Sequence, residues 1–300
     1  MDNIMKDAYD LHIHFAPDVR PRKFDEHELA QRFVAAGMKG FAMKSHFTPT
    51  AERAYMINKL YPQLHVYGGV VMNSSVGGIN PIAVETTAKL GGKFCWMPTF
   101  DARHDIPRLK KSFPEFIEME TKLAAKGLYD DKGIYVLDEN GKIIPDMYAV
   151  LEVVKEYNMV LSTAHISHEE TFALVKAAKE VGVERVLVQH VDWKGTFYEP
   201  EEQKELIRLG AVLEHCYVTT FVPYERNMQE MLDFGLENYI VSTDLGTPAV
   251  PYGKGHLAEG PMPYPDEAML EYAKKMLDYG YTEEQVRTLM VYNPARLVEG

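Results

Sequence analysis

His12 and His14 stand two residues apart in a mostly apolar segment, residues 9–15, that is typical of a short buried strand. Successive side chains of a strand point to opposite faces, so the two imidazoles are expected to point the same way. Two neutral imidazoles side by side on a rigid strand form half of a divalent-metal site. Two core or surface histidines could have the same spacing, so the metal interpretation depends on ligands elsewhere in the chain.

Further candidate ligands stand at the ends of later apolar segments. They are Lys44, His46, His165, His190, Asp244 and either Glu214 or His215. Lys44 and His46 repeat the two-residue spacing, whereas Glu214 and His215 are adjacent, so only one of that pair can face inward. The 11 histidines of the chain would not gather at segment ends by chance. This coincidence is more specific than any single motif.

Imidazoles combined with one carboxylate suit Zn²⁺ best, with Mn²⁺, Fe²⁺, Co²⁺ and Ni²⁺ as alternatives, as one or two ions. A catalytic ion keeps an open position for water and lowers the pKa of that water toward about 7. A carboxylate beside the water can accept its proton, so Asp244 is expected to be both a ligand and the general base. The residue types therefore predict hydrolysis by metal-activated water.

Strand and helix patterns alternate along the chain. The expected strands are 9–15, 39–45, 64–72, 93–98, 159–165, 185–190, 211–217 and 239–243. The expected helices are 26–36, 50–60, 81–90, 147–156, 169–181, 201–209, 224–234, 266–279 and 282–290, with a Pro- and Gly-rich loop at 245–265. Several strands are apolar on both faces, as parallel strands are. Eight strand–helix units predict a (β/α)8 barrel, in which the strand ends share one face.

A doubly wound sheet is the alternative fold, but it would need a glycine-rich phosphate loop after the first strand, and none is present. The alternation pauses at residues 99–145, which we expect to be an insertion after the fourth strand of a single domain spanning residues 1–300. It contains an expected helix at 114–125 and a hairpin between 134–137 and 142–144. Such an insertion either lies over a site or is a surface elaboration.

The composition limits the possible partners. The chain has 300 residues, 46% of them hydrophobic, and a net charge of -12, which disfavours nucleic acid and anionic membranes as partners. Cys95 and Cys216 stand in apolar runs and are expected to be buried thiols, which fits a reducing compartment. No apolar run is long enough for a membrane span, and no signal core is visible, so we expect a cytoplasmic protein.

The sequence resembles the metal-dependent amidohydrolase superfamily. The matching residues are the His12-Ile13-His14 motif, His165, His190 and Asp244, on strands one, five, six and eight, and the tail Asn293-Pro294-Ala295. The resemblance implies a distorted (β/α)8 barrel, one or two divalent metals and, often, a homo-oligomer. It further implies that His12, His14 and His165 bind metal, that His190 binds a second metal or the substrate, and that Asp244 is a ligand and the general base.

The chain departs from this family at the fourth strand, where 94–98 contain neither a lysine nor a glutamate. Members with two metals commonly have a carboxylated lysine or a glutamate there. Lys44 could instead be a displaced bridging ligand, if it is carboxylated, or a cation that binds the substrate. His46 could be a ligand, as in the related polymerase-and-histidinol-phosphatase-like phosphoesterases.

The reaction expected first is hydrolysis of an amide, lactone or related carbonyl bond of a small molecule. Lys44, Arg103 and Arg108 in an otherwise acidic chain favour an anionic substrate. Three alternatives remain open at this point. They are a metal-dependent decarboxylase, a phosphoesterase, and a catalytically inactive barrel that binds a small molecule.

Overall fold

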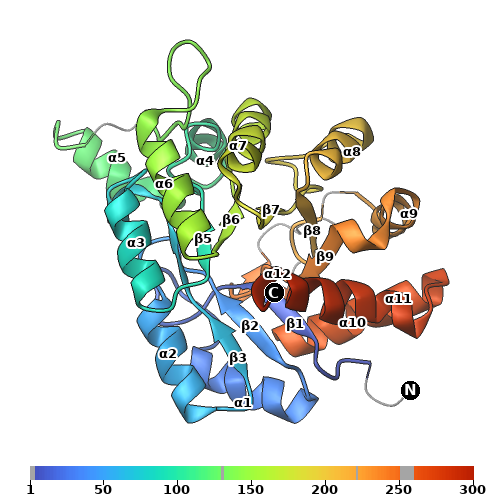
Figure 1. The fold of residues 1–300 in the computed structure, drawn as a ribbon. Helices are drawn as coiled ribbons and strands as arrows, with labels where there is room; N and C mark the ends of the chain where they lie inside the picture. The colour runs from blue at the N-terminus through green and yellow to red at the C-terminus, as the bar shows by residue number, and fades with distance from the viewer. Residues whose placement is uncertain (1–3, 130–131, 221, 251–259) are drawn as a thin grey trace.

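The computed structural model of the chain describes residues 4–129, 132–220, 222–250 and 260–300. Strands surround a central core, and helices cover them on the outside (Figure 1). The barrel strands are β1 (Tyr9–Ile13), β2 (Gly40–Met43), β3 (His65–Tyr67), β4 (Gly69–Val71), β5 (Phe94–Trp96), β6 (Val160–Ser162), β7 (Val186–Val188), β8 (Val212–Cys216) and β9 (Tyr239–Ser242). Each of the eight expected strands contains at least one of them.

Neighbouring strands pair in parallel and in the order of the sequence. One sheet has the order β1-β2-β3 and the other β4-β5-β6-β7-β8-β9. The expected third strand is divided into β3 and β4 at Gly68. A Cβ atom on Gly68 would lie 2.5 Å from the carbonyl oxygen of Thr50, so only glycine allows the bend at this close approach.

The end of β9 returns to β1. The backbone N–H of Asp244 donates to the carbonyl of His12 at 2.9 Å, and the N–H of His14 donates to the carbonyl of Leu245 at 2.8 Å. The strands therefore follow one another around a distorted barrel, as the sequence predicts. The expected Pro- and Gly-rich loop begins here, but its residues 251–259 lie outside the described part of the chain.

A helix follows each strand position. These helices are α1 (Glu26–Ala36), α2 (Ala51–Leu60), α3 (Pro81–Lys89), α6 (Pro145–Glu156), α7 (His168–Val181), α8 (Pro200–Arg208), α9 (Tyr224–Phe234) and α10 (Pro265–Tyr279). Local signals set their ends. Asp25 caps α1 by accepting from the N–H of Glu28, and Gly37 ends this helix with a φ of 73°. No helix in the described ranges is both long and apolar enough to cross a membrane.

The last helix, expected at 282–290, begins as predicted but does not end at residue 290. The structure has α11 (Glu283–Arg287), a π-helical turn (Thr288–Tyr292) and α12 (Asn293–Val298). Pro294 stands in the first turn of α12, directly after the π-helical turn, and its ring fixes φ close to the helical value. The chain therefore continues as a helix through the Asn-Pro-Ala segment.

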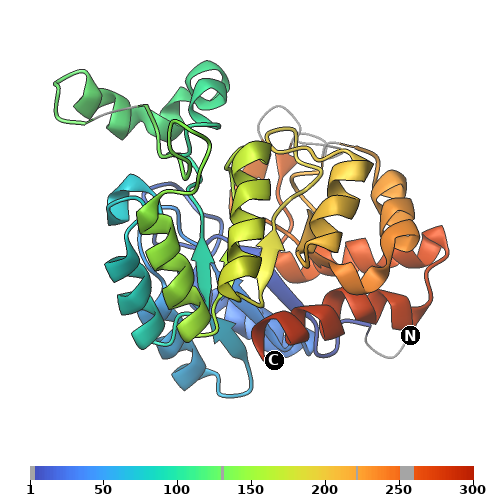
Figure 2. The same cartoon turned by 45° about the horizontal axis from the view of Figure 1, so that its top comes forward.

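Apolar side chains fill the barrel at its amino-terminal end. This inner cluster contains Tyr9, Leu11, Ala42, Val71, Phe94, Trp96, Val160, Leu187, Ile240, Leu297 and Val298. The last two belong to α12, which lies across that end (Figure 2). A second, larger cluster packs the outward faces of the strands against the helices. Polar side chains occupy the opposite end of the barrel, where the strands end.

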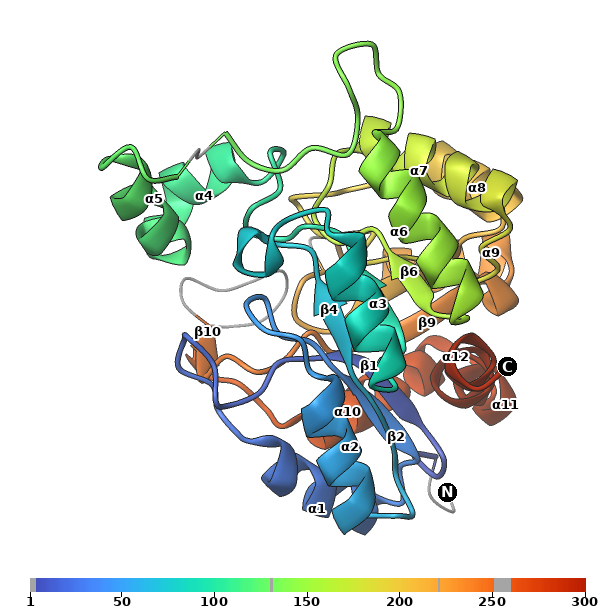
Figure 3. The ribbon, with the colours of Figure 1, turned by 60° about the vertical axis from the view of Figure 1, so that its left-hand side comes forward.

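The insertion after β5 stands on the side where the strands end (Figures 2 and 3). It contains α4 (Ile106–Ser112), which was not predicted. The expected helix at 114–125 begins with a 3₁₀ turn (Pro114–Ile117) and continues as α5 (Glu118–Ala124). The expected hairpin is present as an antiparallel bridge between Leu137 and Ile143.

Candidate metal centre

A β-bulge directs the histidine pair into the barrel. Leu11 points into the inner cluster, so a strict alternation of side chains would turn His12 and His14 outward. The pairing of β1 with β2 shifts register between Asp10 and Ile13, and Ile13 belongs to the outer cluster. The extra residue reverses the alternation, and both histidines face the interior at the strand end.

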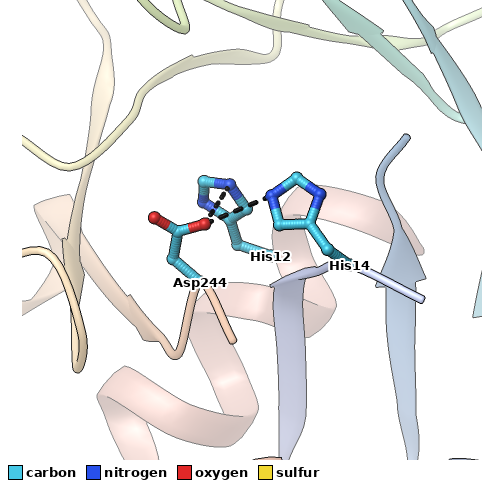
Figure 4. Close-up of side chains that lie close together, drawn as sticks. All are labelled: His12, His14 and Asp244. Atoms are coloured by element: carbon cyan, nitrogen blue, oxygen red, sulfur yellow. Dashed lines mark ion pairs between the residues drawn. The ribbon is translucent and has the colours of Figure 1, made fainter. Parts of the chain in front are cut away.

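Asp244 lies next to both histidines. Its Oδ1 atom is 3.2 Å from Nε2 of His12 and 3.3 Å from Nε2 of His14 (Figure 4). Asp244 has a φ of 54°, a left-handed conformation that is uncommon outside glycine and often marks functional sites. Asp10 joins the ends of β1 and β9. Its carboxylate accepts hydrogen bonds from the N–H of His12 at 3.2 Å and from the hydroxyl of Thr243 at 2.6 Å.

The hydrogen bonds fix which imidazole nitrogen is free. The carbonyl oxygen of Lys44 accepts from Nδ1 of His14 at 3.0 Å, which leaves Nε2 of His14 unprotonated and directed at Asp244. On His12, Nδ1 is 3.0 Å from a carboxylate oxygen of Glu214. Burial lowers the pKa of both histidines well below the usual range, so both are neutral. The neutral imidazole is the form that binds a metal.

Lys44 is buried beside His12. Its Nζ atom is 3.1 Å from Nε2 of His12 and donates to Oε1 of Gln189 at 3.0 Å. Burial lowers the pKa of Lys44 to about 8 and raises the pKa of Glu214 to about 7. Of the adjacent pair on β8, Glu214 faces the interior, because its carboxylate contacts Nδ1 of His12. His215 faces outward, where its Nδ1 lies 3.2 Å from Asp192.

His165 and His190 approach from β6 and β7. Their ring centroids are 5.2 Å apart, and the ring of His190 is 5.8 Å from that of His12. Nδ1 of His165 is 2.8 Å from Oδ2 of Asp105, a residue of the insertion. Nδ1 of His190 is 3.2 Å from the hydroxyl of Thr196, whereas its Nε2 is buried and has no hydrogen-bond partner among the described residues. A buried nitrogen of this kind, without a partner in the protein, is available to an ion, a water molecule or a substrate.

His46 lies on the other side of His14. The two rings stack with centroids 4.4 Å apart and planes inclined by 19°. Nitrogen lone pairs lie in the ring plane, so the lone pairs of two stacked rings lie in two separate, nearly parallel planes, an arrangement that does not favour binding of one ion by both rings. Nδ1 of His46 is 2.9 Å from the hydroxyl of Thr99.

Within the described ranges, two groups of possible ligand atoms converge to within 4.8 Å. One is His12, His14 and Asp244, and the other is His12, Glu214 and Cys216. His46, His165, His190 and Lys44 surround the first group. The neutral imidazoles, the adjacent carboxylate and the orphan Nε2 of His190 fit a divalent ion of the kind expected from the sequence.

Two residues of this site were missed in the sequence. Gln189 stands one position before His190. It could have been found because it is two residues after Leu187, which points into the barrel, and residues two apart on a strand share a face. Asp105 had no such signal because it belongs to the insertion, outside the repeating pattern. Arg108, which was expected to face an anionic substrate, forms an ion pair with Asp105 instead.

Arg103, the other cation of the insertion, lies elsewhere. It lines a cavity of about 790 Å³ together with Tyr135, Asp138, Glu139 and Glu169, and its guanidinium carbon is 4.9 Å from the ring of Tyr135. None of the predicted ligands lines this cavity. Four acidic residues in the lining, the three named above and Asp146, do not suit an anionic substrate, so the prediction for Arg103 has no support at this position.

Solved structures of several hydrolase-type proteins share the fold of this chain. An amidohydrolase from Pseudomonas aeruginosa is 12% identical with a TM-score of 0.64, over 99% of this chain and 97% of that one. An organophosphorus hydrolase from Deinococcus radiodurans is 17% identical with a TM-score of 0.53, over 97% and 92%. The TatD homologue YjjV of Escherichia coli is 13% identical with a TM-score of 0.58, over 99% of each chain. These likenesses establish the fold, and they confirm the barrel type that the sequence resembles.

No curated protein matches the sequence. A family model described as a family of unknown function, DUF6282, matches residues 7–214. This match covers more than half of the 300 residues, and the chain therefore belongs to the family DUF6282.

Proposed function

We propose that the protein is a metal-dependent hydrolase that acts on an amide, lactone or related carbonyl bond of a small anionic molecule. The observation that carries the proposal is the position of Asp244, whose Oδ1 lies 3.2 Å and 3.3 Å from the Nε2 atoms of His12 and His14. The fold, which this chain shares with solved hydrolases, supports it.

His12, His14 and Asp244 would hold the ion, with His165 and His190 on its other side. A bound divalent ion, with Zn²⁺ as the first choice, supplies Lewis acidity and lowers the pKa of water. Asp244 would hold the proton taken from the attacking water on its carboxylate, as a general base. His190, whose Nε2 has no partner among the described residues, would bind a second ion or the substrate.

The position of Lys44 constrains its role. A protonated amine 3.1 Å from Nε2 of His12 would repel an ion held by that nitrogen. Carboxylation of the neutral amine by CO₂ forms a carbamate, releases one proton and replaces the repulsive group with an anionic oxygen ligand. We therefore favour the bridging-ligand role for Lys44 over the role of a cation that binds the substrate.

Elemental analysis of protein purified without added metal and without chelator tests the centre. We expect one or two equivalents of a first-row metal per chain, and a strong reduction in the variant His14→Ala. His168→Ala is the matched control, because His168 is paired with Glu202 at the start of α7. Metal-free protein that takes up no added ion would contradict the proposal and favour a barrel that only binds a small molecule.

The reaction is then tested on the metal-loaded protein with lactones, amides, aromatic acids and phosphoesters. Turnover of lactones or amides that disappears on metal removal and returns on metal addition supports the proposal. Turnover restricted to acids or to phosphoesters would replace it with the decarboxylase or the phosphoesterase alternative. Mass spectrometry under CO₂ would detect the carbamate on Lys44, and its absence, with full metal content in Lys44→Ala, would reject the bridging role.

A further inference from the structure

A buried guanidinium stands in the loop that follows β1. The loop is closed at its base by a hydrogen bond from the N–H of Ala16 to the carbonyl of Phe24, at 2.9 Å. Within it, Nε of Arg22 donates to Oδ2 of Asp18 at 2.6 Å, and the two side chains are only 4% and 2% exposed. Nη2 of Arg22 is buried and has no hydrogen-bond partner among the described residues.

The loop holds Arg22 beside the candidate metal centre. The N–H of the next residue, Lys23, donates to the carbonyl of Gly246 at 2.8 Å. Gly246 packs directly on His14, because a Cβ atom there would lie 2.3 Å from the carbonyl oxygen of His14. Burial is the main cause that lowers the pKa of His14, and the positive charge of Arg22 is the next largest, which agrees with this placement.

Aromatic rings flank the same end of the barrel. The ring of Phe100 lies 4.0 Å from that of His46, and the guanidinium carbon of Arg20 lies 4.5 Å from the ring of Phe100. On the other side, the ring of Trp193 is 4.7 Å from that of His165. A ligand between these walls would meet flat apolar surfaces as well as the cation.

A buried guanidinium with only one carboxylate partner leaves an N–H unsatisfied, which is costly away from water. Guanidinium N–H donors form their strongest hydrogen bonds with anionic oxygens, those of carboxylates and phosphates. We propose that Nη2 of Arg22 binds a carboxylate of the substrate, and that this substrate also carries a planar ring. The inference rests on the function proposed above, because it names the substrate class of the same centre.

Calorimetric titration of the metal-loaded protein with benzoate, benzamide and phenyl phosphate tests the inference. We expect saturable binding of benzoate, and binding of neutral benzamide weaker by about tenfold or more, as one charged hydrogen bond implies. Arg22→Gln should weaken benzoate binding by a similar factor and leave benzamide unchanged. Arg208→Gln, on a side chain that is 71% exposed, is the control and should match the wild type.

Arg22→Gln leaves Asp18 as a lone buried charge and could fail to fold. The double variant Asp18→Asn/Arg22→Gln removes both charges together, and the comparison of benzoate with benzamide on the wild type needs no variant. Equal binding of benzoate and benzamide, or benzoate binding unchanged in the folded double variant, would overturn the inference. Tighter binding of phenyl phosphate than of benzoate would overturn the carboxylate assignment in favour of a phosphate.

The two proposals fail in different ways. Benzoate binding that depends on Arg22, in a protein that holds no metal and hydrolyses nothing, would reject the hydrolase and retain the anion site. Metal-dependent hydrolysis of neutral and acidic substrates at equal rates, unchanged in the folded double variant at positions 18 and 22, would reject the anion site and retain the hydrolase.

Discussion

The two halves of the candidate centre are built differently. On the β1 and β9 side, His12, His14 and Asp244 converge so closely that one carboxylate oxygen is within 3.3 Å of both imidazoles. On the β6 and β7 side, His165 and His190 face the same space with ring centroids 5.2 Å apart and do not join that group.

The difference comes from what holds each half. Backbone hydrogen bonds between neighbouring strand ends join His12 and Asp244 directly, so the barrel itself sets their separation. His165 and His190 are oriented by side chains of later segments, through Asp105 of the insertion and Thr196 of the loop after β7. We therefore expect the first half to be preformed, and the second half to depend on its supporting residues.

The largest effect is expected from Asp244→Asn, in the preformed half. The amide cannot accept the proton from water, so kcat should fall by about 10²–10⁴-fold, while the fold and much of the metal are retained. The measurement is kcat on the substrate identified by the screen, together with metal content. Asp233→Asn, at an exposed position of α9, is the control. Full activity in Asp244→Asn would remove this residue as the base.

A smaller effect is expected from Asp105→Asn, in the supported half. Loss of the carboxylate that orients His165 should weaken metal binding by about 10–100-fold, the usual effect of residues behind a ligand. Competition with a chelator measures this affinity. Arg108→Gln separates the loss of the Asp105–Arg108 ion pair from the loss of the bond to His165. Unchanged affinity in Asp105→Asn would show that His165 does not bind the metal.

The smallest effect is expected from Thr196→Val, which removes one neutral hydrogen bond to His190 and keeps the shape of the side chain. The loss should be about 1 kcal/mol, or about fivefold, in metal or substrate affinity. The same titrations measure it, with Thr121→Val at an exposed position of α5 as the control. An effect as large as that of Asp105→Asn would mean that the hydroxyl of Thr196 contributes as much to this half as the carboxylate of Asp105 does.

The repeating part of the fold could be predicted because the residues within and beside each strand and helix are sufficient to indicate it. Apolar runs mark the strands, and Asp25 and Gly37 mark the ends of the first helix. The insertion was predicted less well because its elements depend on one another. Phe100, Leu109 and Ile117 form a small cluster of their own, which no local pattern indicates.

The sequence by itself determined which candidate ligand types are present and on which strands, because strand ends meet at one face of a barrel. Only the tertiary structure decided which side chains meet. The bulge in β1 turns His12 inward, and a positive φ of 36° at His190 redirects a side chain that follows the inward Gln189. Both departures break the two-residue period on which sequence reasoning depends. Arg22 was likewise found only through its burial beside His14, which the spacing of residues does not reveal.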